Sequence, residues 1–213
     1  MTVRTFNARP PADAATHILQ VACQLFSQHG YKAVGMRCLA EHVGVRPGSL
    51  YYHIESKQSL LYELIESYEN EYLHVIRAVA RKPMSSLREL ADELWVAMTQ
   101  FIAQHPGPAR LTHNEAPNLS AGQGERIHAI RRMRDIELRR LLIINQVLRP
   151  DAAESGDAVQ VLTGILDYVA SLSTTTVSGS RHLIESQLKE LLAKTLHSLK
   201  ALHCGTKLLS RSK

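Results

Sequence analysis

Apolar residues recur every three or four positions along most of this 213-residue chain, and short stretches with glycine or proline separate the runs. That spacing gives each run one apolar face, as expected for amphipathic helices that pack around a shared core. A chain of this length can bury a sizeable core in one large or two small domains. The pattern therefore predicts an all-α protein.

The same runs predict where the helices lie. We expect helices over residues 13–29, two short ones on either side of Gly44, and then 57–81, 85 or 86 to 105, a short piece ending near 114, 125–148, 157–177 and 184–202. Residues 116–124 are expected to form a loop, because turn-forming residues gather there. Residues 1–12 lack a periodic pattern and are expected to be a flexible arm, and residues 204–213 a frayed tail.

The stretch Met36–Lys57 contains the most specific pattern. Gly44 follows a short apolar face, where a glycine can end a helix in the left-handed region at no steric cost. Pro47 suits the first turn of a second helix, because its missing N–H would have no partner there. Leu50 is the expected core anchor of that second helix. Two short helices around a tight turn make a helix-turn-helix candidate, whose second helix can lie in the major groove of DNA.

The run Leu-Tyr-Tyr-His-Ile-Glu-Ser-Lys, placed after Ala-Glu-His-Val-Gly-Val-Arg-Pro-Gly-Ser, resembles the DNA-binding end of tetracycline-repressor (TetR) type transcriptional regulators. The resemblance implies a three-helix DNA-binding domain over residues 1–56 and a larger ligand-binding and dimerisation domain over 57–203. Gly35 and Arg46 depart from the family pattern, which often has a hydroxyl residue at each position. We therefore expect both helix starts to lack a strong side-chain cap, and Arg46 could reach DNA instead.

The resemblance also implies which residues contact DNA. They are Arg37, Arg46, Pro47, Gly48, Ser49, Tyr51, Tyr52, His53 and Lys57. Tyr51 matches a position that faces DNA, whereas Tyr52 matches one that more often packs inward or lies at the groove edge. Lys57 matches a phosphate-binding lysine. A cation in the first turn of a helix opposes the helix dipole, so its presence makes sense if a phosphate also binds there.

Charge and composition narrow the function further. Residues 1–60 carry six basic and three acidic side chains, and the longer remainder carries 19 basic and 17 acidic ones, within a net charge of +5. The positive excess is thus concentrated at the proposed DNA-binding end, as phosphate contact requires. No apolar run approaches the ~18 residues of a membrane span, and no signal peptide is evident, so we expect a cytoplasmic protein without a membrane partner.

The sequence contains no recognisable motif for catalysis or for metal binding. The 11 histidines are scattered and form no zinc-binding or nucleophile motif. The three cysteines are few and far apart, as in small, mostly buried thiols. We therefore predict that the protein is not an enzyme and needs no metal or cofactor.

The larger domain offers two hints about a ligand. Aromatic residues and a methionine in the helix at 86–105 either belong to the core or line a cavity. Arginines in the helix at 125–148 either form a solvated face paired with Asp135 and Glu137, or hold an anionic ligand such as the phosphates of an acyl-coenzyme A. Met133 and Ile144 are expected on the apolar side of this helix. The predicted pocket residues are Trp95, Met98, Phe101, Ile102, His105, Arg134 and Tyr168.

The last two helices can pair with the same helices of a second copy as a four-helix bundle. The leading hypothesis is therefore a homodimeric, ligand-responsive transcriptional regulator of the repressor type. It would bind a palindromic double-stranded DNA operator and be released by a small-molecule effector. The alternative is an architectural DNA-binding dimer that responds to no ligand.

Overall fold

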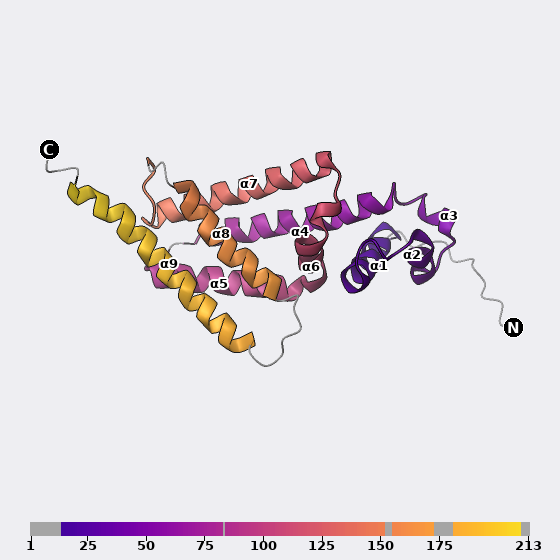
Figure 1. The fold of residues 1–213 in the computed structure, drawn as a ribbon, viewed down its shortest axis with the longest axis horizontal. Coiled ribbons are helices and arrows are strands. Elements are labelled where there is room, and N and C mark those ends of the chain that lie inside the picture. Colours follow the sequence, from indigo (N-terminus) through magenta and orange to yellow (C-terminus); the bar gives the residue numbers. More distant parts are fainter. Residues whose placement is uncertain (1–13, 83, 152–154, 173–180, 210–213) are drawn as a thin grey trace. The chain divides into compact units, whose positions relative to one another are not determined.

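The computed structural model describes residues 14–82, 84–151, 155–172 and 181–209, and these residues form helices without any β-strand (Figure 1). The all-α prediction is confirmed. In chain order the helices are α1 (Ala14–His29), α2 (Met36–Val43), α3 (Pro47–Leu50), α4 (Lys57–Ala80), α5 (Leu87–Gln104), α6 (Pro106–Asn114), the 3₁₀ turn η1 (Ala116–Asn118), α7 (Ala121–Ile144), α8 (Ser155–Leu172) and α9 (Arg181–Leu209).

Contacts divide the chain into two compact units. The first, called here the head, holds the chain through Tyr68 together with Gly107–Ile127, and the second, the body, holds Glu69–Pro106 and the chain from His128 onward. The expected boundary between 56 and 57 coincides with the start of α4. The contacts place the first half of α4 and all but the first residue of α6 with the head.

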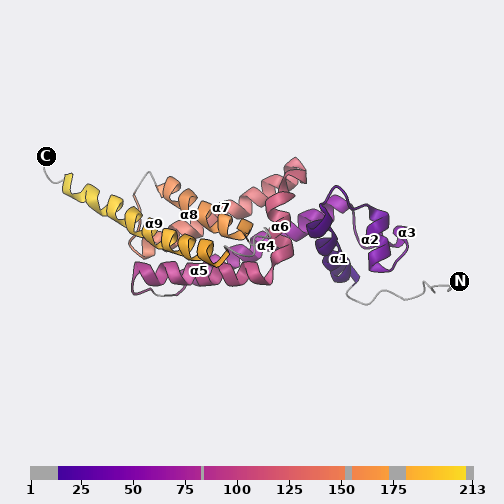
Figure 2. The ribbon, with the colours of Figure 1, turned by 60° about the horizontal axis from the view of Figure 1, so that its bottom comes forward.

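In the head, α1, α2 and α3 pack on one another (Figure 2). The inner stripe of α1 is fully covered, as its helical spacing predicts; it consists of Ile18, Ala22, Leu25 and Phe26. Gly30 and Gly44 end α1 and α2 with φ angles of 85° and 82°, in the left-handed region that a side chain would strain. Leu50 is buried, so its predicted role as the anchor of α3 is confirmed.

Hydrogen bonds at the helix starts follow the sequence. Ser56 and Ser59 cap α4 reciprocally: each hydroxyl oxygen accepts the other residue's backbone N–H at 2.9 Å. Ser86 caps α5 by accepting the N–H of Glu89 at 3.1 Å. Gly35 and Arg46 provide no side-chain cap for α2 and α3, as expected.

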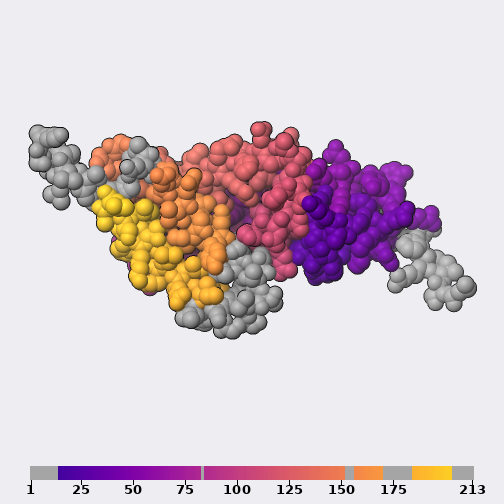
Figure 3. Space-filling view, viewed as in Figure 1, coloured from indigo at the N-terminus to yellow at the C-terminus, as the bar shows by residue number. Residues whose placement is uncertain are grey.

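The body is built around α5, α8 and α9, which contact one another and lie side by side in both ribbon views (Figures 1 and 2). Its core is mainly leucine and other aliphatic side chains, among them Leu90, Leu94, Leu138, Leu141, Leu162, Leu166, Leu192 and Leu196. In the space-filling view, α8 and α9 present a continuous orange-to-yellow surface (Figure 3). Within one chain, α8 and α9 thus pack on each other and on α5.

Some helix boundaries were wrong. Residues 116–124 are not one loop, since they contain η1 and the start of α7. Ser120 explains the early start, because its backbone N–H donates to the Gln123 side chain at 3.0 Å and its hydroxyl accepts the Gln123 N–H at 3.4 Å. At the other end, α7 stops at Ile144 rather than 148, and α9 continues through Leu209, into the predicted tail. The predicted arm and residues 173–177 of the penultimate helix lie outside the described residues.

Candidate nucleic-acid interface

The exposed surface of α2, α3 and the turn that follows contains most of the predicted DNA-binding residues. Arg37, Arg46, Pro47, Gly48, Tyr51, Tyr52 and His53 are exposed, while Ser49 is half-buried. The turn is fixed by the backbone N–H groups of His53 and Ile54, which both donate to the Leu50 carbonyl at 2.9 and 3.0 Å. One buried leucine thus anchors a row of solvent-facing side chains and backbone.

Tyr52 differs from the expectation that it packs inward. Its side chain is 89% exposed, more than that of Tyr51. The reason is the length of α3, which is a single turn ending at Leu50, with Tyr51 as its C-terminal cap residue. Only Leu50 reaches the core from this turn, so both tyrosine rings remain on the outer surface.

Lys57, the first residue of α4, lies against two aromatic rings. Its Nζ is 4.2 Å from the centroid of the Tyr31 ring and 5.9 Å from that of Phe26. The two rings meet edge to face, with centroids 5.4 Å apart. A cation over an aromatic face is attracted by the ring quadrupole. Burial lowers the pKa of Lys57, while the carboxylate of Glu115 acts in the opposite direction.

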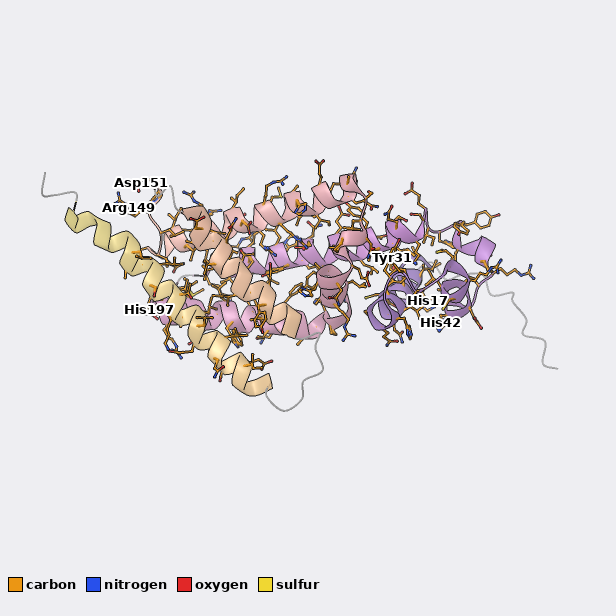
Figure 4. The ribbon with its side chains drawn as sticks, viewed as in Figure 1. His17, Tyr31, His42, Arg149, Asp151 and His197 are labelled. Atoms are coloured by element: carbon orange, nitrogen blue, oxygen red, sulfur yellow. The ribbon has the colours of Figure 1, made fainter. Side chains whose placement is uncertain are left out.

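Tyr31 and Glu115 were missed by the sequence analysis as functional residues. The Tyr31 backbone N–H donates to Glu115 Oε1 at 3.0 Å, and the Asn118 side-chain amide donates to Glu115 Oε2 at 2.6 Å. The Gln58 side-chain amide in turn donates to the Asn118 carbonyl at 3.1 Å. The connection between α6 and α7 therefore holds both Tyr31, whose label appears in Figure 4, and the first turn of α4.

The sequence profile described as "Bacterial regulatory proteins, tetR family" matches residues 18–64, which include most of α1, all of α2 and α3, and the start of α4. This stretch of the chain is therefore a DNA-binding domain of the tetR family. The matched stretch contains the exposed row, the Tyr31 ring and Lys57.

Relatives and solved structures agree with this assignment. The HTH-type transcriptional repressor KstR2 of Rhodococcus jostii (strain RHA1) is 26% identical over 121 residues, which cover 54% of this chain and 59% of that protein. This chain spans little more than half the length of the first such relatives. A tetR-family regulatory protein from Rhodococcus RHA1 has a similar structure (TM-score 0.72, 23% identity, 87% of this chain and 97% of that one). So does the ketosteroid transcriptional regulator KstR2 of Mycobacterium tuberculosis (0.65, 19%, 84% and 93%). At these identities the two structures show a shared fold.

The predicted pocket residues of this tetR-family chain lie in the body. Met98, Phe101 and Ile102 are buried, Trp95 and His105 are half-buried, and Tyr168 is exposed. A line of contacts joins three of them. The His105 ring lies 4.8 Å from the Phe101 ring, Phe101 lies 5.8 Å from Tyr72, and the guanidinium carbon of Arg134 lies 4.7 Å from the Tyr72 ring, all measured to ring centroids.

Arg134 is buried in the body, and three carboxylates lie near its guanidinium group. It is 4% exposed, and its guanidinium nitrogens lie 3.3 Å from Asp167, 3.7 Å from Asp135 and 3.8 Å from Glu69. Glu69 is 2% exposed and accepts a hydrogen bond from Arg131 at 2.6 Å. Burial lowers the pKa of Arg134, but the neighbouring tyrosine and carboxylates together raise it above the ordinary value, so the side chain is charged.

This ion cluster (Glu69, Arg131, Arg134, Asp135 and Asp167), in which Glu69 and Arg134 are buried and the other three are half-buried, corrects the expected apolar side of α7. Met133 and Ile144 are exposed, because the inward positions repeat at Ile127, Arg134 and Leu141, seven residues apart. The guanidinium of Arg134 is thus already paired with protein carboxylates. Of the alternatives drawn from the sequence, the described contacts of Arg134 match neither a solvated face nor a free anion-binding arginine.

Other features of the described body bear on ligands. A hollow of about 170 Å³ is lined by residues 84–87 and 144–146 and by Lys200, and it includes none of the predicted pocket residues. Among the residues that the structure describes, no three His, Cys, Asp or Glu side chains are grouped so that they could hold a metal ion. Within the same residues, no helix has both the length and the apolar character to cross a membrane.

Proposed function

We propose that this tetR-family chain is a homodimeric, ligand-responsive transcriptional regulator, acting as a repressor on a palindromic double-stranded DNA operator. The observation that carries the proposal is the exposed row on α2 and α3 that ends at Lys57. Small or backbone-exposing residues at Pro47 and Gly48 let the start of α3 approach base edges. Arg37, Arg46 and Lys57 supply the charge that phosphates attract.

Dimerisation follows from how such a head reads DNA. One short recognition helix covers few base pairs, so two heads about 34–36 Å apart are needed to enter successive major grooves. The last two helices leave apolar side chains uncovered, namely Val161 and Tyr168 on α8 and Leu191 on α9. A second copy that packs on this surface would bury them and form a four-helix bundle. The partner in this proposal is therefore an identical chain.

The effector is proposed to bind in the body, near the line of contacts from His105 through Phe101 and Tyr72 to Arg134. Trp95, Met98 and Ile102 lie on the same helix as Phe101 and favour an apolar molecule of the acyl or fused-ring type. The Mycobacterium tuberculosis relative is a ketosteroid transcriptional regulator, which agrees with an apolar effector. To act, the effector must bind the DNA-free conformation more tightly than the DNA-bound one.

The first experiment selects DNA with the full-length protein at physiological salt, from sheared genomic DNA of its source, and sequences what is retained. Enrichment of a few short inverted repeats is expected. Broad retention without a repeated site would contradict operator recognition and favour an architectural DNA-binding dimer. Absence of retention would contradict DNA binding altogether. A thermal-shift screen of apolar metabolites, repeated on the operator complex, then tests whether an effector releases the DNA.

A further inference from the structure

We propose that Glu115 is a positioning residue for DNA binding: it holds Tyr31 and the Lys57 ammonium in the arrangement that presents Lys57 to a phosphate. The proposal rests on the proposed function, since it assigns a new role within the same DNA-binding surface. Glu115 lies outside the stretch matched by the family profile and 84 positions from Tyr31. All the residues involved belong to the head.

Both oxygens of the Glu115 carboxylate accept a hydrogen bond. Oε1 accepts the backbone N–H of Tyr31, and Oε2 accepts the side-chain amide of Asn118. The bond to Tyr31 fixes the residue by its main chain, directly after Gly30, whose φ of 85° sets the turn. A Cβ at Gly30 would lie 3.5 Å from Glu115 Oε1, so the turn passes close to the carboxylate. Glu115 thus fixes the backbone of Tyr31, the residue whose ring contacts Lys57.

The same segment also holds α4 on the far side of Lys57. Asn118 accepts the Gln58 amide through its carbonyl, while its own backbone N–H donates to the Glu115 carbonyl at 2.9 Å. Tyr31, whose ring contacts the Lys57 ammonium, and Gln58, the next residue of the chain, are therefore both hydrogen-bonded to residues 115–118. A long lysine side chain loses rotamer freedom when it is held, and this device imposes that order before DNA arrives.

Removal of Glu115 is expected to have two opposite effects on DNA binding, because Glu115 is both a negative charge and a positioning residue. A carboxylate near the DNA surface repels phosphates, so its removal alone would strengthen binding slightly. Loss of position acts the other way, because the ammonium would leave the Tyr31 ring and the Tyr31 N–H would lose its acceptor. A hydrogen bond to a charged group is stronger than a neutral one and the cation–ring contact adds to it, whereas salt screens the repulsion between separated exposed charges. We therefore expect position to outweigh repulsion.

The first test needs no DNA. In the free, full-length protein, the Lys57 side-chain methylene protons should be shifted upfield in NMR spectra by the Tyr31 ring current. Glu115→Ala should abolish that shift, and Glu115→Gln, which keeps an acceptor for Tyr31, should retain most of it. Glu125→Ala removes an exposed carboxylate of the same unit and should change nothing. An unaltered Lys57 signal in a folded Glu115→Ala variant would overturn the proposal.

The second test uses the best duplex recovered by the selection experiment. Lys57→Ala should weaken binding about tenfold in the wild-type background but less than about threefold in the Glu115→Ala background, since Lys57 is then already displaced. A role of Glu115 in fold stability alone would leave the tenfold effect intact, and that result contradicts positioning. If wild-type protein retains no DNA, the proposed function fails, while the NMR test still decides whether Glu115 orders Lys57.

Discussion

Among the residues that the structure describes, Lys57 and Arg134 each lie over a tyrosine ring, and their surroundings are opposite. In the head, the Lys57 ammonium is 4.2 Å from the Tyr31 ring centroid and half-buried, with one carboxylate nearby. In the body, the Arg134 guanidinium is 4.7 Å from the Tyr72 ring centroid and is enclosed by three carboxylates. The comparison teaches that the ring orients both charges, whereas the number of carboxylates decides whether a charge remains available to a new partner.

The largest expected effect is on the body. Arg134→Met should lower the free energy of unfolding by about 2–3 kcal/mol, because Asp135 and Asp167 lose their paired guanidinium and the buried Glu69 keeps only Arg131 as a charge partner. Urea denaturation at one fixed protein concentration measures this, since a dimer's stability depends on concentration. Arg132→Met, at an exposed position of the same helix, is the control and should change stability by less than about 0.5 kcal/mol. A loss below 1 kcal/mol for Arg134→Met would mean that the cluster relaxes or admits water.

A paired substitution sharpens the comparison. Glu69→Met combined with Arg134→Met should recover about half of the stability lost by Arg134→Met alone, because both buried charges leave together. Arg131, which is less buried than Arg134, would still interact with Asp167. The same denaturation series measures it. Additive losses in the double variant would show that Glu69 and Arg134 act independently.

A substitution at Lys57 in the head should change DNA affinity rather than the free energy of unfolding. Lys57→Ala is expected to weaken DNA binding about tenfold for all sequences alike and to reduce the slope of log affinity against log salt by about one. Fluorescence anisotropy over a series of salt concentrations measures both quantities. Lys82→Ala removes a lysine of the body that pairs with Glu93 and is the matched control. An unchanged slope for Lys57→Ala would mean that Lys57 contacts no phosphate.

The smallest expected effect concerns Ser56, the N-terminal cap residue that precedes Lys57 at the start of α4. Ser56→Ala should cost about 1 kcal/mol of unfolding free energy, because the Ser59 N–H loses its acceptor. The loss should appear in thermal or urea unfolding with little change in DNA affinity. Glu63→Ala, at an exposed position inside the same helix, serves as control. Equal effects of both substitutions would rule out a specific role of the cap.

Local patterns in the sequence predicted the head well. Gly44, Pro47 and Leu50 lie within seven positions of one another, and each acts through backbone preference or burial that a short window reveals. The Tyr31–Glu115 bond spans 84 positions and follows no periodicity, so only the folded chain shows it. The cap at Ser120 is different, because Ser120 and Gln123 form a local Ser-x-x-Gln capping pattern that a short window contains, and the two nearby glycines favoured a loop instead.

The body was harder to predict because it contains Arg134, a buried charged residue. Arginine is almost never fully buried unless it is paired, so a pattern of apolar positions assigns Arg134 to the surface. Its partners come from α4 and α8 as well as from α7, and they lie up to 65 positions away in the sequence. Its inward direction therefore follows from tertiary pairing.

Because α4 belongs to both units, the head of this chain is not a module that can be cut at the loop before that helix. A head that ended at residue 56 would lose Leu60, Leu61 and Ile65, all of them buried. It would also lose Glu115, which comes back to the head from beyond α5. A chimaeric regulator that borrows this head must therefore take two separate pieces of the chain, through Tyr68 and from Gly107 to Ile127, and join them to its host in the middle of two helices.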